Sequence, residues 1–221
     1  SITIIHERYF MRIGLIMENS QADKNSMVYE CLNEIASQHG HEVVNFGMYS
    51  SADEYQVTYV KEGLIAAILL QTKAVDFVVT GCGTGEGAML ALNSFPGVLC
   101  GHVVDPEDAY MFTQINDGNA IALPFAKGMG WGSELRLKNI FEQLFVAPGG
   151  GGYPKERVVP EQRNKKILDQ VKTVTHHDML YILKNLDPEF VKETLSGKSF
   201  RDLFEKYADS SELSLYVKSL F

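Results

Sequence analysis

Residues 75–88 read Val75-Asp76-Phe77-Val78-Val79-Thr80-Gly81-Cys82-Gly83-Thr84-Gly85-Glu86-Gly87-Ala88. The first six form a short apolar run, which predicts a buried parallel strand. The strand leads into a loop that holds three glycines between Gly83 and Gly87. Glycine lets the backbone approach a ligand closely, and successive amides at a helix start bind anions. The stretch therefore predicts an anion-binding loop at a strand-to-helix junction, beyond the carboxyl end of a strand.

On both sides of this loop, apolar strand patterns alternate with amphipathic helix patterns. The predicted strands span residues 12–17, 41–46, 75–80, 97–104 and 119–123, and the predicted helices span 20–38, 57–72, 87–94, 106–114 and 133–145. Such alternation is typical of a parallel sheet. Beyond Pro160 only helix patterns remain, at 161–174, 177–185, 188–195, 199–207 and 211–220. We therefore predict a Rossmann-like α/β fold, an open parallel five-stranded sheet with helices on both faces, plus an all-α C-terminal extension.

The chain divides at the run Gly149–Gly152 and at Pro160. We expect an α/β domain over 11–148, a glycine-rich joint and arm over 149–159, and a helical extension over 160–221. Residues 1–10 precede the first strand pattern and are left out of the fold. The apolar faces of the extension need burial, which they can gain by covering the edge of the sheet or by clasping a second subunit.

The composition is that of an ordinary globular protein. The 221 residues are 45% hydrophobic and carry a net charge of −8, so the chain lacks the basic surface of a general nucleic-acid binder. No apolar run approaches the ~20 residues of a membrane span. The cysteines Cys31, Cys82 and Cys100 show no C-x-x-C spacing, as expected of free thiols in a reducing cytoplasm. We therefore expect a cytoplasmic protein that binds neither nucleic acid nor membrane.

Three side chains of the loop offer chemistry. A thiol beside a helix N-terminus ionises readily, which makes Cys82 a candidate proton-transferring base. Thr84 offers a hydroxyl, and Glu86 is a second candidate base. The plainer interpretations are that Cys82 is a small buried apolar residue and that Glu86 is an acid placed to suit the helix dipole.

A dinucleotide site is a competing interpretation of the same glycines. Residues 83–88 match the pattern G-x-G-x-x-A, and Asp105 follows at the end of the next predicted strand. That fingerprint usually opens its domain, whereas two strand–helix units precede it here. A dinucleotide-dependent oxidoreductase is therefore the weaker alternative.

The loop, together with residues farther along the chain, resembles the type B ribose-5-phosphate isomerase and galactose-6-phosphate isomerase family. The residues that carry the resemblance are Gly81 to Gly87, Asn93, the run Asp105-Pro106-Glu107-Asp108-Ala109-Tyr110 and the run Gln114-Ile115-Asn116-Asp117-Gly118-Asn119. The resemblance covers roughly 11–159. The helical extension resembles a longer subgroup of the family.

The resemblance implies a sugar-phosphate aldose–ketose isomerase that acts on ribose 5-phosphate or a related pentose or hexose phosphate through a cis-enediolate. It implies that Cys82 transfers the proton and that Asn116 and Arg157 contact substrate, with Arg157 on the phosphate. The anion hole would comprise Thr84 and the amides of Gly83, Gly85, Glu86 and Gly87. The resemblance implies no metal and no organic cofactor. It also implies a homodimer or a dimer of dimers with the active site at the interface, which favours a clasping role for the extension.

Several positions depart from the family pattern. Glu18-Asn19 replaces an Asp-His pair after the first strand, and Ile115 replaces a ring-opening histidine. Tyr153 occupies one phosphate-arginine position, and Lys127, beside Ala126, is a one-residue substitute for another. Isoleucine cannot transfer a proton. Either another group such as His102 opens the ring, or the substrate arrives open-chain, or the activity differs. A non-catalytic sugar-phosphate binding protein is therefore a second alternative.

Other candidate residues have plainer interpretations. We interpret His176-His177-Asp178 as a solvated helix surface, because adjacent helical residues point about 100° apart. Trp131 could stack on a sugar, but we expect it to pack at a helix start. Asp53 and Tyr55 follow the second strand and could line the pocket.

Overall fold

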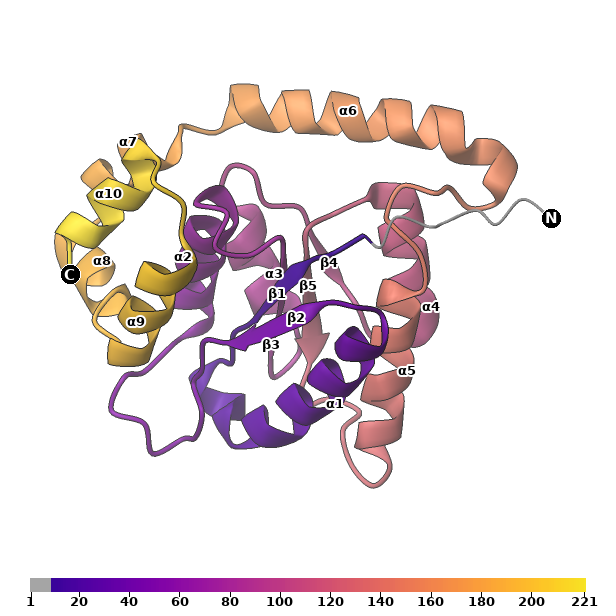
Figure 1. The fold of residues 1–221 in the computed structure, drawn as a ribbon, viewed down its shortest axis with the longest axis horizontal. Coiled ribbons are helices and arrows are strands. Elements are labelled where there is room, and N and C mark those ends of the chain that lie inside the picture. Colours follow the sequence, from indigo (N-terminus) through magenta and orange to yellow (C-terminus); the bar gives the residue numbers. More distant parts are fainter. Residues whose placement is uncertain (1–8) are drawn as a thin grey trace.

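The computed structural model describes residues 9–221, and a five-stranded parallel sheet forms its centre (Figure 1). The strands are β1 (Arg12–Leu15), β2 (Glu42–Asn45), β3 (Phe77–Cys82), β4 (Cys100–His102) and β5 (Ala120–Pro124), in the order β2-β1-β3-β5-β4. This confirms the predicted open parallel sheet. Residues 1–8, which make up most of the segment left out of the predicted fold, lie outside the described residues, while Tyr9 and Phe10 are exposed.

Helices cover both faces of the sheet, as predicted. One face carries α1 (Asn25–Gln38), α4 (Pro106–Met111) and α5 (Ser133–Phe145), and the other carries α2 (Tyr59–Gln71) and α3 (Glu86–Asn93). Because β3 and β5 are buried along their whole length, their side chains fill both layers of the core. Within residues 9–221, none of the helices combines the length and the apolar composition that crossing a bilayer requires.

Several predicted boundaries are wrong by a few residues. The predicted helix over 20–38 consists of the 3₁₀ turn η1 (Asn19–Lys24) and then α1, and the predicted helix over 106–114 is α4 followed by the π turn η2 (Phe112–Asn116). The predicted strand over 97–104 shortens to β4, and Gly97 at its predicted start adopts a left-handed φ of 68°.

The C-terminal extension contains the long helix α6 and a group of short helices. A 3₁₀ turn η3 (Lys155–Arg157) leads into α6 (Val158–Thr175), and the short helices are α7 (Met179–Asn185), α8 (Pro188–Thr194), α9 (Lys198–Tyr207) and α10 (Glu212–Ser219). Figure 1 shows α6 running along one edge of the molecule and the short helices grouped beside α2.

The short helices bury their apolar faces within the chain. Met179, Leu183, Val191, Phe200 and Phe204 belong to the same buried cluster as the inner faces of α2 and α3. The expectation that these faces clasp a second subunit is therefore wrong for α7 to α10, because the outer side of α2 is itself apolar and provides the partner surface. They cover the α/β domain instead, which is the other alternative.

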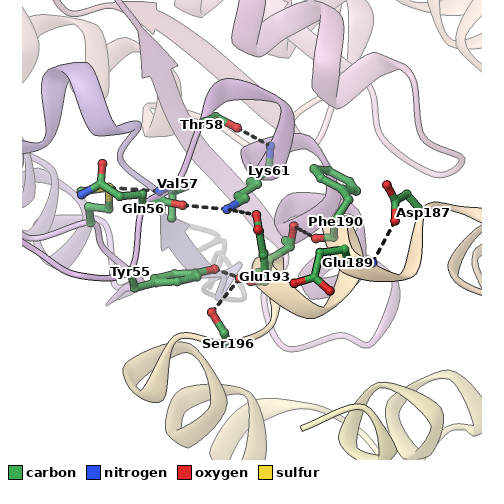
Figure 2. A network of polar contacts seen from close by, with 12 residues as sticks. Tyr55, Gln56, Val57, Thr58, Lys61, Asp187, Glu189, Phe190, Glu193 and Ser196 are labelled. Atoms are coloured by element: carbon green, nitrogen blue, oxygen red, sulfur yellow. Dashed lines mark hydrogen bonds and ion pairs between the residues drawn. The ribbon is translucent and has the colours of Figure 1, made fainter.

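Polar contacts fix this docking at the start of α2 (Figure 2). The Tyr55 hydroxyl donates to the Thr194 carbonyl, and Lys61 pairs with Glu193 at 3.1 Å between Nζ and Oε2. Lys61 also donates to the Gln56 carbonyl at 3.2 Å. The extension thereby holds the loop that follows β2.

Helix α6 differs from the short helices because it contains no buried residue. Its exposed apolar side chains are Val159, Ile167, Leu168, Val171 and Val174. Lys172 anchors it to the amino edge of the sheet by donating to the carbonyls of Asn93 and Val98.

Candidate active site

The strand order defines where a ligand can bind. In the order β2-β1-β3-β5-β4, the connections that follow β1 and β3 run over opposite faces of the sheet, so the carboxyl ends of these two strands form a topological switch point, where open parallel sheets bind ligands. The glycine loop follows β3, and Glu18 and Asn19 follow β1. Two predicted groups of site residues therefore meet at this topological switch point.

The glycine loop is held in a conformation that only glycine adopts easily. Gly85 has a φ of 80° and forms the N-cap of α3. A side chain there would place Cβ 2.9 Å from His102 Cδ2 and 2.9 Å from the Leu123 carbonyl carbon. The Gly83 carbonyl accepts from the amides of Ala126 and Lys127 at 3.0 and 3.1 Å, which ties the loop to the segment after β5. The loop is thus fixed before any ligand arrives.

Cys82 lies at the centre of this loop. Its side chain is buried, and its sulfur accepts a hydrogen bond from the Gly85 amide at 3.2 Å. Thr84 is exposed, and its Oγ1 accepts from the Glu86 amide at 3.3 Å. Glu86 is exposed in the first turn of α3. The first amides of a helix lack intrahelical acceptors, so this turn presents donors beside the thiol.

His102 contacts the loop from β4. Its Nε2 lies 2.8 Å from the Thr84 carbonyl oxygen, and the ring is half-buried. The ring therefore supports the loop from outside. This contact gives His102 a structural role and does not support the ring-opening role considered for it.

Glu18 and Asn19 follow β1, on the other side of the switch point from the glycine loop. Glu18 is buried and accepts from the Ser20 hydroxyl at 2.6 Å, and the Asn19 amide donates to the Val57 carbonyl at 2.7 Å. Glu18 also lies close enough to Glu62 to influence its ionisation, and so does Cys82.

Two lysines border this edge of the sheet. Lys127 is exposed in the segment after β5, beside the glycine loop. Sequence reasoning missed Lys24, which ends the 3₁₀ turn after β1 and donates to the Phe125 carbonyl. The signal that could have identified Lys24 in the sequence is a basic residue shortly after the first strand. Together they provide positive charge beside the anion-binding loop.

The remaining predicted substrate residues lie at the other edge of the sheet. Asn116 is exposed at the end of η2, before β5 begins, while Cys82 pairs in register with Pro124 at the end of β5. From Ala120 to Pro124 strand β5 extends about 13 Å, so its length separates the Asn116 end of the sheet from the Cys82 end. Tyr153 is half-exposed against Tyr110, with ring centroids 5.9 Å apart, and Arg157 is exposed at the start of α6. One chain therefore does not bring Asn116, Tyr153 and Arg157 to its own Cys82.

The structure also places the secondary candidates. The expectation that Trp131 packs at a helix start is wrong: it is fully exposed (108%), because the left-handed Gly132 that caps α5 turns it outward. Tyr55 is directed into the contact with α8 rather than toward the glycine loop. Asp53 caps its own turn by accepting from the Tyr49 amide at 2.7 Å.

Two further candidates have local structural roles. Asp105 caps α4 by accepting from the Asp108 amide at 2.8 Å, which accounts for an acid at that position without a nucleotide. His177 stacks on Tyr181 with centroids 3.9 Å apart, and His176 contacts the Thr175 hydroxyl.

Two protein families match the chain. The family described as Ribose/Galactose Isomerase matches residues 13–158, and a family described as Ribose-5-phosphate isomerase matches residues 174–220. The first match includes the glycine loop and the whole sheet except Arg12, the first residue of β1. The second falls on the C-terminal helices, in agreement with the expected longer subgroup.

Solved structures agree with these matches. A 4-deoxy-L-threo-5-hexosulose-uronate ketol-isomerase, solved with a tartrate, is 54% identical, covers 95% of this chain and 99% of its own, and has a TM-score of 0.92. The ribose-5-phosphate isomerase LacAB_rpiB from Vibrio parahaemolyticus is 47% identical, covers 96% of this chain and 100% of its own, and has a TM-score of 0.93. A type B ribose 5-phosphate isomerase from Trypanosoma brucei, 19% identical over 74% of this chain and 99% of its own, shares the fold with a TM-score of 0.62.

The predicted resemblance is confirmed, because one family match spans more than half of the chain and two structures above 45% identity cover nearly all of it. The chain belongs to the ribose/galactose isomerase family, whose enzymes are intramolecular isomerases.

Proposed function

We propose that this protein is an aldose–ketose isomerase that acts on an anionic sugar through a cis-enediolate. The observation that carries the proposal is the position of Cys82, whose sulfur accepts from the Gly85 amide inside a loop that presents helix-start donors. A base and an oxyanion hole within one loop are the two elements that an enediolate mechanism needs.

The steps balance without a cofactor. The Cys82 thiolate removes the proton from the carbon beside the carbonyl, and the loop amides stabilise the oxygen that becomes negative. The Cys82 thiol then returns the proton to the neighbouring carbon, while a hydroxyl proton moves between the two oxygens. We assign the relay of that second proton to Thr84, which is exposed at the loop surface. No electron leaves the substrate, so no oxidant is required.

The anion of the substrate is a phosphate or a carboxylate. A phosphate carries close to two negative charges at neutral pH, and several cations usually bind it, whereas one arginine binds a carboxylate in a bidentate pair. Of the two matched positions in the arm, one holds Arg157 and the other Tyr153. The single arginine favours the carboxylate, and the relative at 54% identity is named as a uronate isomerase.

We propose further that two copies of the chain complete each site. Cys82 and Glu18 lie at the carboxyl edge of the sheet, and Asn116 and Arg157 lie at the amino edge of the same chain. The unburied helix α6, which begins directly after Arg157 and exposes Val171 and Val174, provides an apolar surface for a second copy. In a homodimer, the amino edge of each subunit would lie against the carboxyl edge of its partner.

The experiment offers three substrates to the purified protein: ribose 5-phosphate, galactose 6-phosphate and 4-deoxy-L-threo-5-hexosulose uronate. Product formation is followed by NMR, with Cys82→Ala as the control. We expect the uronate to turn over fastest and the variant to be inactive. If only a sugar phosphate turns over, the anion of the substrate is a phosphate. Tight binding of a sugar without turnover would instead identify a non-catalytic binding protein.

A further inference from the structure

Glu62 is a fully buried acid in the otherwise apolar inner face of α2. Its exposure is 0%, and the residues that follow it from Gly63 to Leu69 are also buried. Its Oε1 lies 2.6 Å from Thr80 Oγ1, and its Oε2 has no hydrogen-bond partner among residues 9–221. An acid buried in this way demands an explanation, because an unpaired buried charge is strongly unfavourable.

The hydrogen-bond arrangement assigns a proton to Glu62. Thr80 Oγ1 lies 2.8 Å from the Ile16 carbonyl oxygen as well as 2.6 Å from Glu62. A hydroxyl has one proton to donate, and a carbonyl can only accept. If Thr80 donates to Ile16, the proton between Thr80 and Glu62 comes from Glu62. Burial raises the pKa of Glu62 well above its usual value, and this effect, to which Glu18 and Cys82 add, outweighs the opposing effect of hydrogen bonding by Thr80 and the Gly81 backbone.

This contact lies directly beneath the candidate active site. Thr80 and Cys82 are two residues apart on β3, so their side chains point to the same face of the sheet. That face is the one covered by α2, and Cys82 belongs to its buried cluster. Ile16 follows the last residue of β1, so the contact joins α2, β3 and the chain leaving β1 at the switch point.

We propose that Glu62 is a positioning residue that remains protonated and, through Thr80, fixes the end of β3 from which Cys82 projects. Its neutral state keeps further negative charge away from a site in which negative charge passes from the Cys82 thiolate to a substrate oxygen. The effect on catalysis rests on the proposed function of Cys82. The protonation state of Glu62 and its positioning of the Cys82 thiol do not rest on that function.

Infrared spectroscopy tests the protonation state without any assay of activity. The difference spectrum between the wild-type protein and Glu62→Gln at neutral pH is expected to contain the carbonyl band of a protonated carboxylic acid. Glu189→Gln, which changes an exposed glutamate, should show carboxylate bands instead. Carboxylate bands for Glu62 would overturn the proposal.

The pH profile of Cys82 alkylation by iodoacetamide, read by mass spectrometry of its peptide, tests the positioning role. Glutamine preserves an uncharged donor to Thr80, so Glu62→Gln should leave the profile unchanged. Glu62→Leu and Thr80→Val remove the contact and should alter the rate by about threefold or more. In the isomerase assay they should lower kcat by about tenfold or more, with a smaller change in KM, and glutamine should restore it.

Each contrary outcome is informative. If leucine at position 62 behaves like wild type, Glu62 does not position Cys82. If glutamine is as damaging as leucine in a folded protein, the carboxyl proton itself is required and the positioning role is wrong. If Glu62→Leu does not fold, Thr80→Val still tests the positioning role and the infrared spectrum still tests the protonation state. If no sugar turns over, the alkylation profile tests the inference separately from the proposed function.

Discussion

The Gly85 amide donates a hydrogen bond to the Cys82 sulfur over 3.2 Å. This contact brings the backbone of Gly85 against the thiol, so a single turn of backbone positions both the start of α3 and the candidate base. It also requires the left-handed conformation of Gly85. The loop conformation and the reactivity of Cys82 are therefore expected to depend on each other.

Replacing Gly85 by alanine should damage the loop. The added Cβ would lie 2.9 Å from backbone at Leu123 and from the His102 ring, at a φ of 80°. We expect a loss of at least about 1 kcal/mol in the free energy of unfolding and a large loss of isomerase activity. Gly130→Ala is the matched control, because a Cβ there has no neighbour within 4 Å. Equal effects of the two substitutions in urea unfolding would refute the role given to Gly85.

The proposed sharing of the site between two copies can be tested by complementation. Cys82→Ala and Arg157→Ala should each be inactive alone. In a mixed dimer, the intact Cys82 of one subunit would meet the intact Arg157 of the other, so random pairing should restore about one quarter of the wild-type sites. Activity that stays at background after refolding the two variants together would show that each chain forms its own site.

Glu62 should impose a pH dependence on stability. Its pKa is raised in the folded protein, whereas in the unfolded chain it is about 4.3. Its stabilising contribution is therefore fully present below the unfolded pKa and is lost as pH rises through the folded pKa. Glu18 and Cys82 face Glu62 and raise its pKa, and Glu62 in turn raises the pKa of the buried Cys100.

The measurement is urea unfolding of wild type and Glu62→Gln at a series of pH values, starting below the unfolded pKa of Glu62 and rising toward its folded pKa. Between the two pKa values, the unfolding equilibrium constants should diverge in favour of glutamine by about tenfold per pH unit. Parallel stability curves for the two proteins would mean that Glu62 titrates normally.

The extension should be loosened by removing a single hydroxyl. The Tyr55 ring is largely buried and its hydroxyl donates to the Thr194 carbonyl, so Tyr55→Phe leaves that acceptor unpaired. We expect a loss of about 1 kcal/mol in the free energy of unfolding. Tyr181→Phe is the control, since Tyr181 is exposed. Stability unchanged by Tyr55→Phe would indicate that apolar packing alone holds the extension.

The fold could be predicted from the sequence because its signals are local. The central strands are short apolar runs, and the glycines after Thr80 identify a sharp turn into a helix. The π turn over Phe112–Asn116 could not be predicted, since it depends on contacts with the distant Gly149 and Gly150 segment. The burial of α7 to α10 depends likewise on the surface of α2, which is remote in sequence.

The candidate site could be predicted only in part. Cys82 and the glycine loop follow one another in the chain, so their proximity was certain. The separation of Asn116 and Arg157 from them follows from which edge of the sheet each segment reaches, and that requires the strand order. Glu62 carried a signal that was overlooked: an acid directly before the apolar run Gly63 to Leu70. Its partner Thr80 could be found only in three dimensions.

The most direct measurement is incorporation of solvent deuterium into substrate and product by wild type and Cys82→Ser. The enediolate mechanism predicts deuterium at the carbon that accepts the proton, and a loss of exchange of about a hundredfold or more in the variant. Exchange that continues unchanged in Cys82→Ser would contradict the assignment of Cys82 as the base.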